Sequence, residues 1–405
     1  MKILVINAGS SSIKYQLLDM ESQTVMVSGI VERIGEANGT LAHKKFTDGK
    51  EEKTVLEQEI RDHKDGMHLL IECITAPKTG VISSKNEINA IGHRVVQGGE
   101  SFNSATLINE ATKKAIEENN SLAPLHNPAN LTGITVAEEL FPDTPNIAVF
   151  DTEFHQSMPA RAYMYALPYD FYTDLKIRRY GYHGTSHKYV AKRAAAVLGK
   201  APEEVNVITV HLGNGGSITA VKQGRCMDTS MGMTPLAGIM MGSRCGDIDP
   251  AIPGYIAEAQ NISFREVDAL LNNESGLKGI CGMNDMRDIH TRSVAGDDRA
   301  KLAVEMFIYQ VKKFIGAYFA ALGNVDIIAF TAGIGENDDV VRAGVCENMQ
   351  GLGIEIDLTA NKGRISEEKQ LSTAASSVHV WVIPTNEELQ IALDTIEVLR
   401  AQEDQ

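Results

Sequence analysis

The apolar positions of this chain repeat one arrangement about half its length apart. An apolar strand, a tight turn of small residues with an Asn, and a second strand are predicted over residues 3–19 (ILVINAGSSSIKYQLLD) and again over 205–222 (VNVITVHLGNGGSITAVK). Turns of small residues leave backbone N–H groups unshielded, and successive N–H groups can cradle phosphate oxygens. A single Gly/Ser turn between strands is most often only a hairpin. The duplication, with Asn7 and Lys14 in one copy and His211 and Asn214 in the other, favours two similar halves that face one polyphosphate.

Strand and helix patterns alternate along the rest of the chain, as they do in α/β proteins. Apolar runs predict strands at 25–33, 88–96, 146–150 and 326–330. Helical spacing predicts helices at 67–74, 109–119, 128–140, 187–198, 300–322 and 386–401. The polar stretch 35–64 predicts either a further hairpin at a sheet edge or an exposed loop. Because no strand follows the last helix, we expect that helix to pack back on the first domain.

The length of the chain sets the expected number of domains. At 405 residues it is longer than one hydrophobic core usually supports, so we expect two. A boundary is expected near Asp151, where a predicted strand ends. The first domain would then comprise residues 1–150 with about 386–405, and the second residues 151–385.

Composition excludes several classes of partner. The net charge of −15 argues against a nucleic-acid-binding protein, which normally needs a basic face. The five cysteines show no CxxC spacing and are typical of reduced thiols in a cytosolic protein. The first apolar run is about four residues long, too short for a signal peptide, and no run approaches the ~20 residues of a membrane span. We therefore expect a cytoplasmic protein with neither a nucleic acid nor a membrane as partner.

Several segments carry polar residues that a core or a simple turn does not require. Asp151 closes the strand IAVFD, at the carboxyl edge where α/β sheets place their ligands. Arg94 comes directly after largely apolar strand positions, and FTAGIGEN (330–337) is a strand-to-helix turn whose glycines allow close approach of a flat or anionic ligand. The other segments of this kind are PLHNP (124–128), YHGTSH (182–187), SRCGDIDP (243–250) and PTNEEL (384–389).

Each of these signals has a structural alternative. His183 and His187, at i and i+4, could bind a metal, but no third ligand is evident and HExxH is absent. Arg94 and Arg244 could form structural ion pairs. In PTNEEL, Asn386 could cap a helix whose first turn is stabilised by two glutamates. The basic run of Lys176, Arg178 and Arg179 is most simply a solvated face.

The motifs taken together closely resemble those of the acetate kinase family. The matching segments are NAGSSSIKY, GHRVVQGGE, PLHNP, VFDTEFH, RRYGYHGTSH, HLGNGGS, MTPLAGIMMGSRCGDIDP, TAGIGENDD and PTNEEL, spread in the expected order over essentially the whole chain. The resemblance implies an α/β fold of two duplicated ribonuclease-H-like (actin-like ATPase) domains, the second binding the nucleotide, which lies in the interdomain cleft. It also implies a homodimer that transfers the γ-phosphoryl group of ATP to acetate, reversibly and in line, giving acetyl phosphate and ADP. Mg²⁺ is the implied cofactor, and Mn²⁺ can substitute for it.

The resemblance also implies roles for particular residues. Asn7 and Glu387 would help to hold Mg²⁺, and Arg94 would bind the substrate carboxylate. Asp151, His183 and Arg244 would lie at the transferring phosphoryl group. The nucleotide would be bound by Lys14, His211, Leu212, Gly213, Asn214, Gly215, Asp285, Met286, Arg287, Gly333, Ile334, Gly335, Glu336 and Asn337. The substrate methyl group would lie in a small apolar pocket of Val96, Leu125, Tyr182 and Pro235, where the family often has Phe in place of Tyr182.

The residue types agree with this chemistry. Phosphoryl transfer requires positioning and charge stabilisation more than covalent catalysis. Arg94 and Arg244 supply planar, permanently charged donors, and His183 supplies a third donor. Acetate is already a carboxylate at neutral pH, because carboxyl pKa values lie near 4. It needs no general base, so we expect Asp151 to orient Arg or His donors or a Mg²⁺-bound water. With an alcohol as acceptor, Asp151 could instead accept a proton.

Three alternative functions can be compared on the same residues. A sugar kinase of this fold would need an Asp base and a large polar pocket, whereas Val96, Leu125 and Pro235 beside an Arg suit a short fatty acid. A nucleotide-dependent switch protein would need neither the Arg nor the apolar pocket. A propionate kinase is the nearest alternative, because one methylene in an apolar pocket is worth only ≈ 1–3 kcal/mol.

Overall fold

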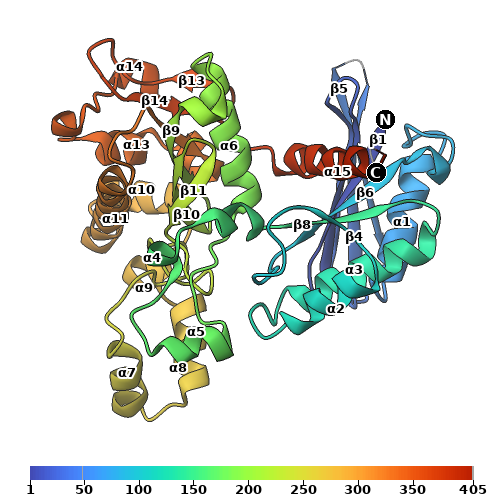
Figure 1. The fold of residues 1–405 in the computed structure, drawn as a ribbon, viewed down its shortest axis with the longest axis horizontal. Helices are drawn as coiled ribbons and strands as arrows, with labels where there is room; N and C mark the ends of the chain where they lie inside the picture. Colours follow the sequence, from blue (N-terminus) through green and yellow to red (C-terminus); the bar gives the residue numbers. More distant parts are fainter. Residues whose placement is uncertain (48, 404–405) are drawn as a thin grey trace. The chain divides into compact units, whose positions relative to one another are not determined.

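The structure is a computed structural model that describes residues 1–47 and 49–403 (Figure 1). Contacts divide the chain into two compact units. Unit 1 comprises Met1–Glu153 with the C-terminal segment from Asn386, and unit 2 comprises Phe154–Thr385. The sequence-based boundaries, at 150/151 and about 386, lie close to these.

The sheet of unit 1 has the strand order β5-β4-β3-β2-β1-β6-β8-β7. Strands β1, β6 and β8 are parallel to one another, and the remaining pairs are antiparallel. The strands are β1 Lys2–Ala8, β2 Ser12–Asp19, β3 Thr24–Glu32, β4 Gly39–Thr47, β5 Lys50–Gln58, β6 Ala90–Val95, β7 Thr106–Leu107 and β8 Asn146–Phe150. The helices are α1 His63–Thr75, α2 Glu110–Glu118, α3 Asn127–Leu140 and α15 Glu387–Glu403. The polar stretch 35–64 thus forms the edge hairpin β4–β5, the first of its two predicted alternatives.

The sheet of unit 2 has the order β11-β10-β9-β12-β14-β13. Its strands are β9 Asn206–Leu212, β10 Gly216–Lys222, β11 Arg225–Thr229, β12 Ile327–Thr331, β13 Lys369–Gln370 and β14 His379–Val382. Its helices are α4 Ala160–Tyr163, α5 Tyr169–Leu175, α6 Gly184–Val197, α7 Ile252–Gln260, α8 Phe264–Asn273, α9 Gly276–Cys281, α10 Met286–Val294, α11 Asp298–Leu322, α12 Ala332–Asn337, α13 Asp339–Cys346 and α14 Leu358–Asn361. Apolar periodicity did not predict the strands β7, β11, β13 and β14 or the helices α4, α5, α7 to α10, α13 and α14.

The two sheets repeat one topology, which confirms the predicted duplication. The order β3-β2-β1-β6-β8 in unit 1 matches β11-β10-β9-β12-β14 in unit 2, with three parallel strands at the same places in each. After the last parallel strand of each sheet, the chain forms a helix that packs on the other copy of the sheet. Helix α6, which follows β8 after the short helices α4 and α5, packs on β9 and β12, and α15, which follows β14, packs on β1, β6 and β8. The predicted return of the last helix to the first domain is therefore confirmed.

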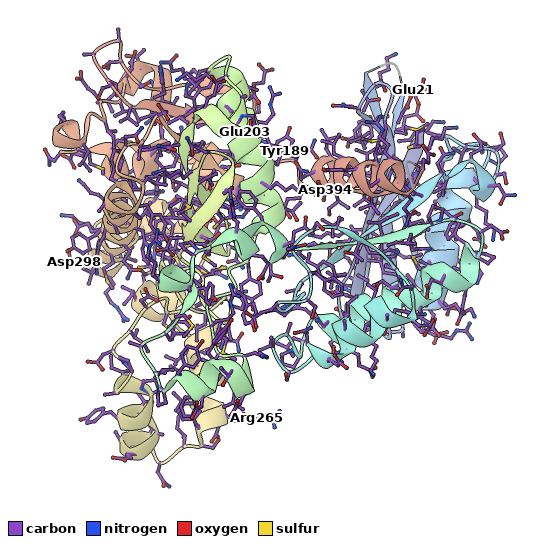
Figure 2. All side chains as sticks on the ribbon, viewed as in Figure 1. Glu21, Tyr189, Glu203, Arg265, Asp298 and Asp394 are labelled. Carbon is purple, nitrogen blue, oxygen red and sulfur yellow. The ribbon has the colours of Figure 1, made fainter. Side chains whose placement is uncertain are left out.

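The long helix α11 shows why these elements form. Its N-cap Asp297 accepts from the backbone N–H groups of Arg299 and Ala300, and the exposed Asp298 lies in its first turn (Figure 2), where a negative charge stabilises a helix. Its buried residues recur every three or four positions and join the main apolar core of unit 2. The helix ends at Gly323, whose φ of +84° favours glycine.

The basic run before His183 is not a solvated face. Lys176 is exposed, but Arg178 is 4% exposed, with its guanidinium 3.7 Å from the ring centre of Tyr163. Arg179 donates from Nη1 to the carbonyls of Thr229 and Ser230, at 2.5 and 3.0 Å. The expectation is therefore wrong for both arginines, because Arg178 is buried against the Tyr163 ring and Arg179 anchors the segment before His183 to the end of β11.

Two expectations about chemical environment can also be compared with the structure. All five cysteines are free thiols, with three buried and two partly exposed, as predicted. Within the described residues, no helix is both long enough and apolar enough to span a membrane.

Candidate active site

Arg94, in β6, forms a two-point ion pair with Asp151, the residue after β8. Its Nε lies 3.0 Å from Oδ1 of Asp151, and its Nη2 lies 2.6 Å from Oδ2. Its Nη1 lies 3.4 Å from Oδ1 of Asn7, near the end of β1. Because β1, β6 and β8 are neighbouring parallel strands, their C-terminal ends bring the three side chains together. Asp151 is 2% exposed, so its charge is compensated chiefly by Arg94.

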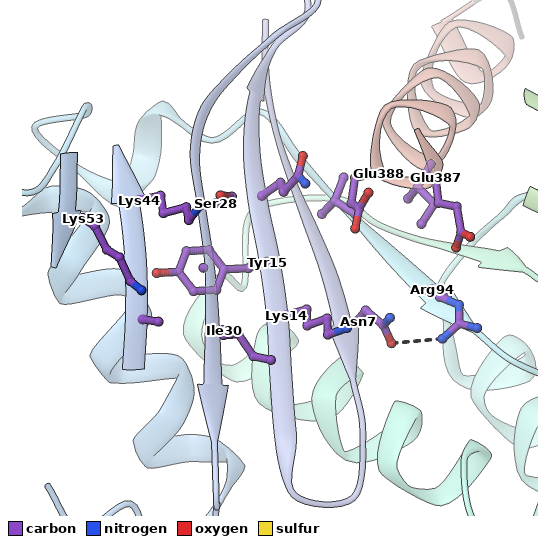
Figure 3. Close-up of a pocket in the computed structure, with 15 residues that line it drawn as sticks. Asn7, Lys14, Tyr15, Ser28, Ile30, Lys44, Lys53, Arg94, Glu387 and Glu388 are labelled. Atoms are coloured by element: carbon purple, nitrogen blue, oxygen red, sulfur yellow. Dashed lines mark hydrogen bonds between the residues drawn. The ribbon is translucent and has the colours of Figure 1, made fainter. Parts of the chain in front are cut away.

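These residues adjoin a pocket of ≈ 290 Å³ in unit 1 (Figure 3). Asn7, Lys14, Arg94 and Glu387, all predicted site residues, line it. Asn386 caps α15 by accepting from Leu389 N at 3.1 Å, which starts the helix so that Glu387 reaches the pocket. The pocket continues along the sheet to Ser28, Lys44 and Lys53 on β3, β4 and β5, residues that no sequence motif indicated.

The charges in this pocket perturb one another. Burial raises the pKa of Glu387 to about 7, and Asp151 and Glu388 add to this effect while Arg94 and Lys14 oppose it. Burial alone would lower the pKa of Arg94, but the charges of Asp151 and Glu387 raise it overall. The pocket therefore combines the charged guanidinium of Arg94 with the carboxyl group of Glu387, whose ionised form a bound cation would stabilise.

A buried asparagine that sequence reasoning missed fixes this part of the sheet. Asn130, on α3, donates to the carbonyl of Ala8 at 2.7 Å and accepts from the N–H of Val96 at 3.1 Å. It thereby joins the end of β1 to the residue that follows β6. The second Asn of PLHNPAN could have indicated this role from the sequence, because a polar residue at a buried helix position requires hydrogen-bond partners.

In unit 2, the turn between β9 and β10 lies beside His183 and Arg244. A Cβ built on Gly215 would lie 3.5 Å from Nε2 of His183 and 3.6 Å from Nη1 of Arg244. Three predicted residues from separate motifs are thus brought to one place, and a side chain at position 215 would fill it. Arg244 also donates from Nη1 to the carbonyl of Pro235 at 3.2 Å. Burial lowers the pKa of Arg244, yet a guanidinium remains charged at neutral pH.

The ring of His183 is held by neighbours on both sides. It stacks on His211 with ring centres 4.3 Å apart and planes 20° apart. Its Nδ1 lies 2.8 Å from Oγ of Ser217, and the same hydroxyl lies 2.7 Å from Nε2 of His187. His183 itself has φ +56°, a strained conformation for a non-glycine residue that is typical of functional sites.

The pair His183 and His187 is not arranged as a metal site. Within the described residues, no group of three or more His, Cys, Asp or Glu side chains could hold a metal ion. Both rings face the Ser217 hydroxyl instead, as their hydrogen bonds show. The metal alternative for this pair is therefore not supported by the geometry.

A larger pocket of ≈ 880 Å³ in unit 2 collects most of the predicted nucleotide residues. Those that line it are Gly213, Asn214, Asp285, Met286, Arg287, Gly333, Ile334 and Asn337. His290, Asp338 and Arg364 line it too and were not predicted. His290 contacts Asp338 at 2.7 Å, and this hydrogen bond raises the pKa of His290.

The other predicted nucleotide residues do not line this pocket. Leu212 is fully buried in the apolar core, and Gly335 is buried at the packed end of β12. Glu336 accepts from Ala332 N at 2.9 Å within its own turn. His211 and Gly215 lie beside His183, as described above.

The four residues predicted to line the substrate pocket have different environments. In unit 1, Val96 is 6% exposed and Leu125 is 78% exposed. Val95 packs into an apolar cluster, whereas Val96 belongs to none of the clusters formed by the described residues. In unit 2, Pro235 is half-buried, and Tyr182 is 3% exposed with its hydroxyl donating to Met233 O at 2.7 Å.

The chain is similar over its whole length to known proteins. A model of the acetokinase family matches residues 2–393. The acetate kinase of Oleidesulfovibrio alaskensis is 58% identical over 401 residues, 99% of this chain and 100% of that protein. The acetate kinase of Thermotoga maritima is 51% identical over 402 residues, 98% of this chain and 99% of that protein.

Solved structures agree with these relatives. The acetate kinase of Porphyromonas gingivalis has a TM-score of 0.94 at 43% identity and covers 98% of this chain and 99% of its own. A propionate kinase from Francisella tularensis has a TM-score of 0.89 at 42% identity and covers 97% of this chain and 98% of its own. These matches confirm the predicted fold class of two duplicated actin-like ATPase domains. The chain therefore belongs to the acetokinase family, enzymes that transfer a phosphoryl group to acetate.

Proposed function

We propose that this chain transfers the γ-phosphoryl group of ATP to acetate, reversibly and in line, with unit 1 binding the acceptor and Mg²⁺ and unit 2 binding the nucleotide. The observation that carries the assignment within the site is the Arg94–Asp151 pair beside a carboxylate-lined pocket. An acceptor that is itself a carboxylate requires a fixed cation and no base, and this pair supplies that combination.

Arg94 is the residue that binds the acetate carboxylate. Asp151 engages Nε and one N–H of Nη2, and Asn7 engages Nη1 at a longer distance. A guanidinium has five N–H donors in a planar fork, so its outer edge retains donors for a second carboxylate. Asp151 positions that edge by holding the other one, which is the orienting role expected for it.

The residues around Glu387 fit a magnesium ion. Mg²⁺ prefers oxygen ligands and is usually held by one or two carboxylates together with water and substrate phosphates. Asn7 and Glu387 offer an amide oxygen and a carboxylate in one pocket, and the raised pKa of Glu387 indicates a buried acid that lacks sufficient positive charge. We therefore assign Asn7 and Glu387 to Mg²⁺. When bound, the ion neutralises charge on the phosphate oxygens, and Mn²⁺ can replace it.

Unit 2 supplies the groups that act on the transferring phosphoryl. Its large pocket binds the nucleoside, and the turn 213–215 contacts the phosphates. His183 and Arg244 point donors into the space over Gly215, where they stabilise the charge of the equatorial oxygens.

Arg94→Ala tests the acceptor assignment. The variant is expected to raise KM for acetate by roughly 10- to 100-fold, because a charged hydrogen bond contributes about 1.5–3 kcal/mol, while KM for ATP changes little. Initial rates of acetyl phosphate formation, trapped with hydroxylamine, give both constants. The matched control is Arg61→Ala, which removes an exposed guanidinium paired two-point with Asp65. An unchanged acetate KM in the folded variant would make Arg94 structural and the assignment wrong.

The preferred chain length of the acid is the second aspect of function, because a propionate kinase is among the similar structures. Val96→Ala is expected to raise kcat/KM for propionate and butyrate relative to acetate by roughly 10- to 200-fold, since removing about two methyl groups makes space for a methylene. KM for ATP should not change. Rates with formate, acetate, propionate and butyrate measure this preference in wild type and variant.

Val95→Ala is the matched control for that experiment. Val95 precedes Val96 but is fully buried in an apolar cluster, so its truncation should lower stability without changing acid preference. If the two variants have the same acid preference, Val96 is ordinary core and Tyr182 is the next position to test.

We further propose a homodimer that works in the cytoplasm. Exposed apolar side chains of unit 2 support association, among them Tyr169, Leu175, Tyr255 and Phe264 on α5, α7 and α8, which are 64%, 57%, 74% and 69% exposed. Free thiols throughout fit a reducing compartment.

A further inference from the structure

The hydroxyl of Ser217 lies between two histidine rings. It is 2.8 Å from Nδ1 of His183 and 2.7 Å from Nε2 of His187. The other nitrogen of His187, Nδ1, lies 2.6 Å from Oγ1 of Thr209. Ser217, His187 and Thr209 are all 0% exposed, so bulk water does not compete for these hydrogen bonds. The result is a continuous series of hydrogen bonds from Thr209 to the ring of His183.

His187 is neutral in this environment. Burial lowers its pKa well below the ordinary value, and the neighbouring rings of His155, His211 and His183 lower it further. A neutral imidazole has one N–H donor and one acceptor nitrogen. The Ser217 hydroxyl has a single proton, and because it is fully buried between the two rings, that proton is bound to one ring while the oxygen accepts from the other. The direction of the Thr209–His187 hydrogen bond therefore determines the direction of the two bonds that Ser217 makes with His187 and His183.

The distances favour one of the two directions. If Thr209 donates to His187, then His187 donates from Nε2 to Ser217, and Ser217 donates to Nδ1 of His183. In the opposite direction the hydroxyl of Thr209 must donate to Thr219 O, which is 3.4 Å away. The Thr209–His187 contact of 2.6 Å is shorter than the ~2.7–3.2 Å of bonds donated by N–H groups but ordinary for bonds donated by hydroxyls, which makes Thr209 the donor. The 3.4 Å separation from Thr219 O is too long for a full-strength bond from the same hydroxyl.

We propose that His187, acting through Ser217, is a positioning residue that holds His183 in the tautomer with its proton on Nε2. This inference rests on the proposed function only for its consequence, which is that a neutral His183 donates a hydrogen bond to the transferring phosphoryl. Nε2 of His183 and Nη1 of Arg244 both border the space over Gly215, so this tautomer directs a second donor to the same place as the guanidinium. The opposite tautomer would present a lone pair to phosphate oxygens and repel them.

The ring of His183 is also fixed in orientation, which makes the tautomer effective. It stacks on His211, whose Nδ1 contacts the Ser186 hydroxyl at 2.8 Å. Both Ser186 and His187 lie in the first turns of α6, directly after His183. The motif HGTSH thus contains both the donor, His183, and residues that orient it. Orienting His183 accounts for His187, which metal binding does not.

The kinetic test compares variants in the presence and absence of His183. Ser217→Ala and His187→Leu are expected to lower kcat by roughly 10- to 100-fold, the range seen when groups that orient a functional histidine are removed from metal sites, with little change in either KM. His187→Gln retains an N–H donor for Ser217 and is expected to restore most of the rate. In a His183→Ala background, Ser217→Ala should cause no further loss, because it acts through the missing ring.

Ser230→Ala is the matched control. Ser230 is also buried beside β10, but its hydroxyl accepts from Ile218 N at 2.9 Å and takes no part in the hydrogen bonds from Thr209 to His183. The variant should leave kcat unchanged. Equal losses from Ser217→Ala with and without His183, or wild-type kcat in Ser217→Ala, would overturn the proposal.

NMR spectroscopy of the His183 ring nitrogens tests the tautomer without measuring enzyme activity. In wild-type protein with ¹⁵N-labelled histidine, the His183 ring, assigned with His183→Gln, should show a protonated Nε2 and an unprotonated Nδ1 at neutral pH. The reverse pattern would refute the tautomer directly. If wild type failed to phosphorylate any short acid, the proposed function would fail, while this spectrum would still decide the inference.

Discussion

Asp151→Asn is expected to lower kcat by roughly 100- to 1,000-fold, the loss typical when an oriented electrostatic group is disabled. The substitution keeps the shape of the side chain but removes the charge that holds Nε and Nη2 of Arg94. Since Asp151 is 2% exposed, it also leaves a buried guanidinium without its main counter-charge. Because the acceptor is already ionised, no new pH requirement should accompany the loss. The pH dependence of kcat from 6 to 9 measures both effects.

The matched control is Asp65→Asn, which disrupts a two-point Arg–Asp pair of similar geometry on the surface of unit 1. Its kcat should equal that of wild type. Recovery of full activity by Asp151→Asn at high pH would show that hydroxide replaces a base, and Asp151 would then be a proton acceptor rather than the residue that orients Arg94.

Arg244→Lys is expected to lower kcat by roughly 100-fold or more, with a smaller effect on KM for acetate and ATP. Lysine keeps the positive charge but lacks the planar fork that can donate to Pro235 O and to a phosphoryl oxygen at once. A loss concentrated in kcat is the signature of a contact made in the transition state. Steady-state rates with each substrate varied in turn separate the two constants.

Arg193→Lys provides the control for that substitution, since Arg193 forms a two-point ion pair with Glu368 on the surface of unit 2. It should behave as wild type. If Arg244→Lys raised KM for acetate and left kcat unchanged, Arg244 would bind the ground state and its assignment to the transferring phosphoryl would be wrong.

The proposed roles of the two units follow from their shared topology. In each unit a hairpin with a tight small-residue turn leads into a set of three parallel strands. The copies have diverged in the residues at the ends of those strands, with Asn7, Arg94 and Asp151 in unit 1 and His211 beside Ser217 in unit 2. Duplication thus supplied two equivalent sheet edges, and in our proposal different side chains adapt them to an acceptor and a nucleotide.

The sequence by itself determined the parts of this protein that depend on local chemistry. The repeated strand–turn–strand pattern predicted the duplicated sheets, because alternating apolar residues and small turn residues specify a hairpin without distant partners. The Asn386 cap of α15 and the free cysteines followed from composition and spacing in the same way, whereas the stretch that forms the edge hairpin β4–β5 was predicted as either a hairpin or a loop. Motif order also identified the candidate site residues, though not which of them touch.

Only the tertiary structure decided which side chains meet. Arg94 and Asp151 are 57 residues apart in the chain, and their pairing follows from the parallel alignment of β6 and β8. Glu387 reaches the unit 1 pocket because α15 returns to β1, β6 and β8 after the whole of unit 2. Arg178 and Arg179 looked solvated because a run of charge carries no information about the rings and carbonyls that bury it. Likewise, Ser217 becomes the link between His183 and His187 only when β10 lies beside α6 and β9, since hydrogen bonds depend on distance in space and not on separation along the chain.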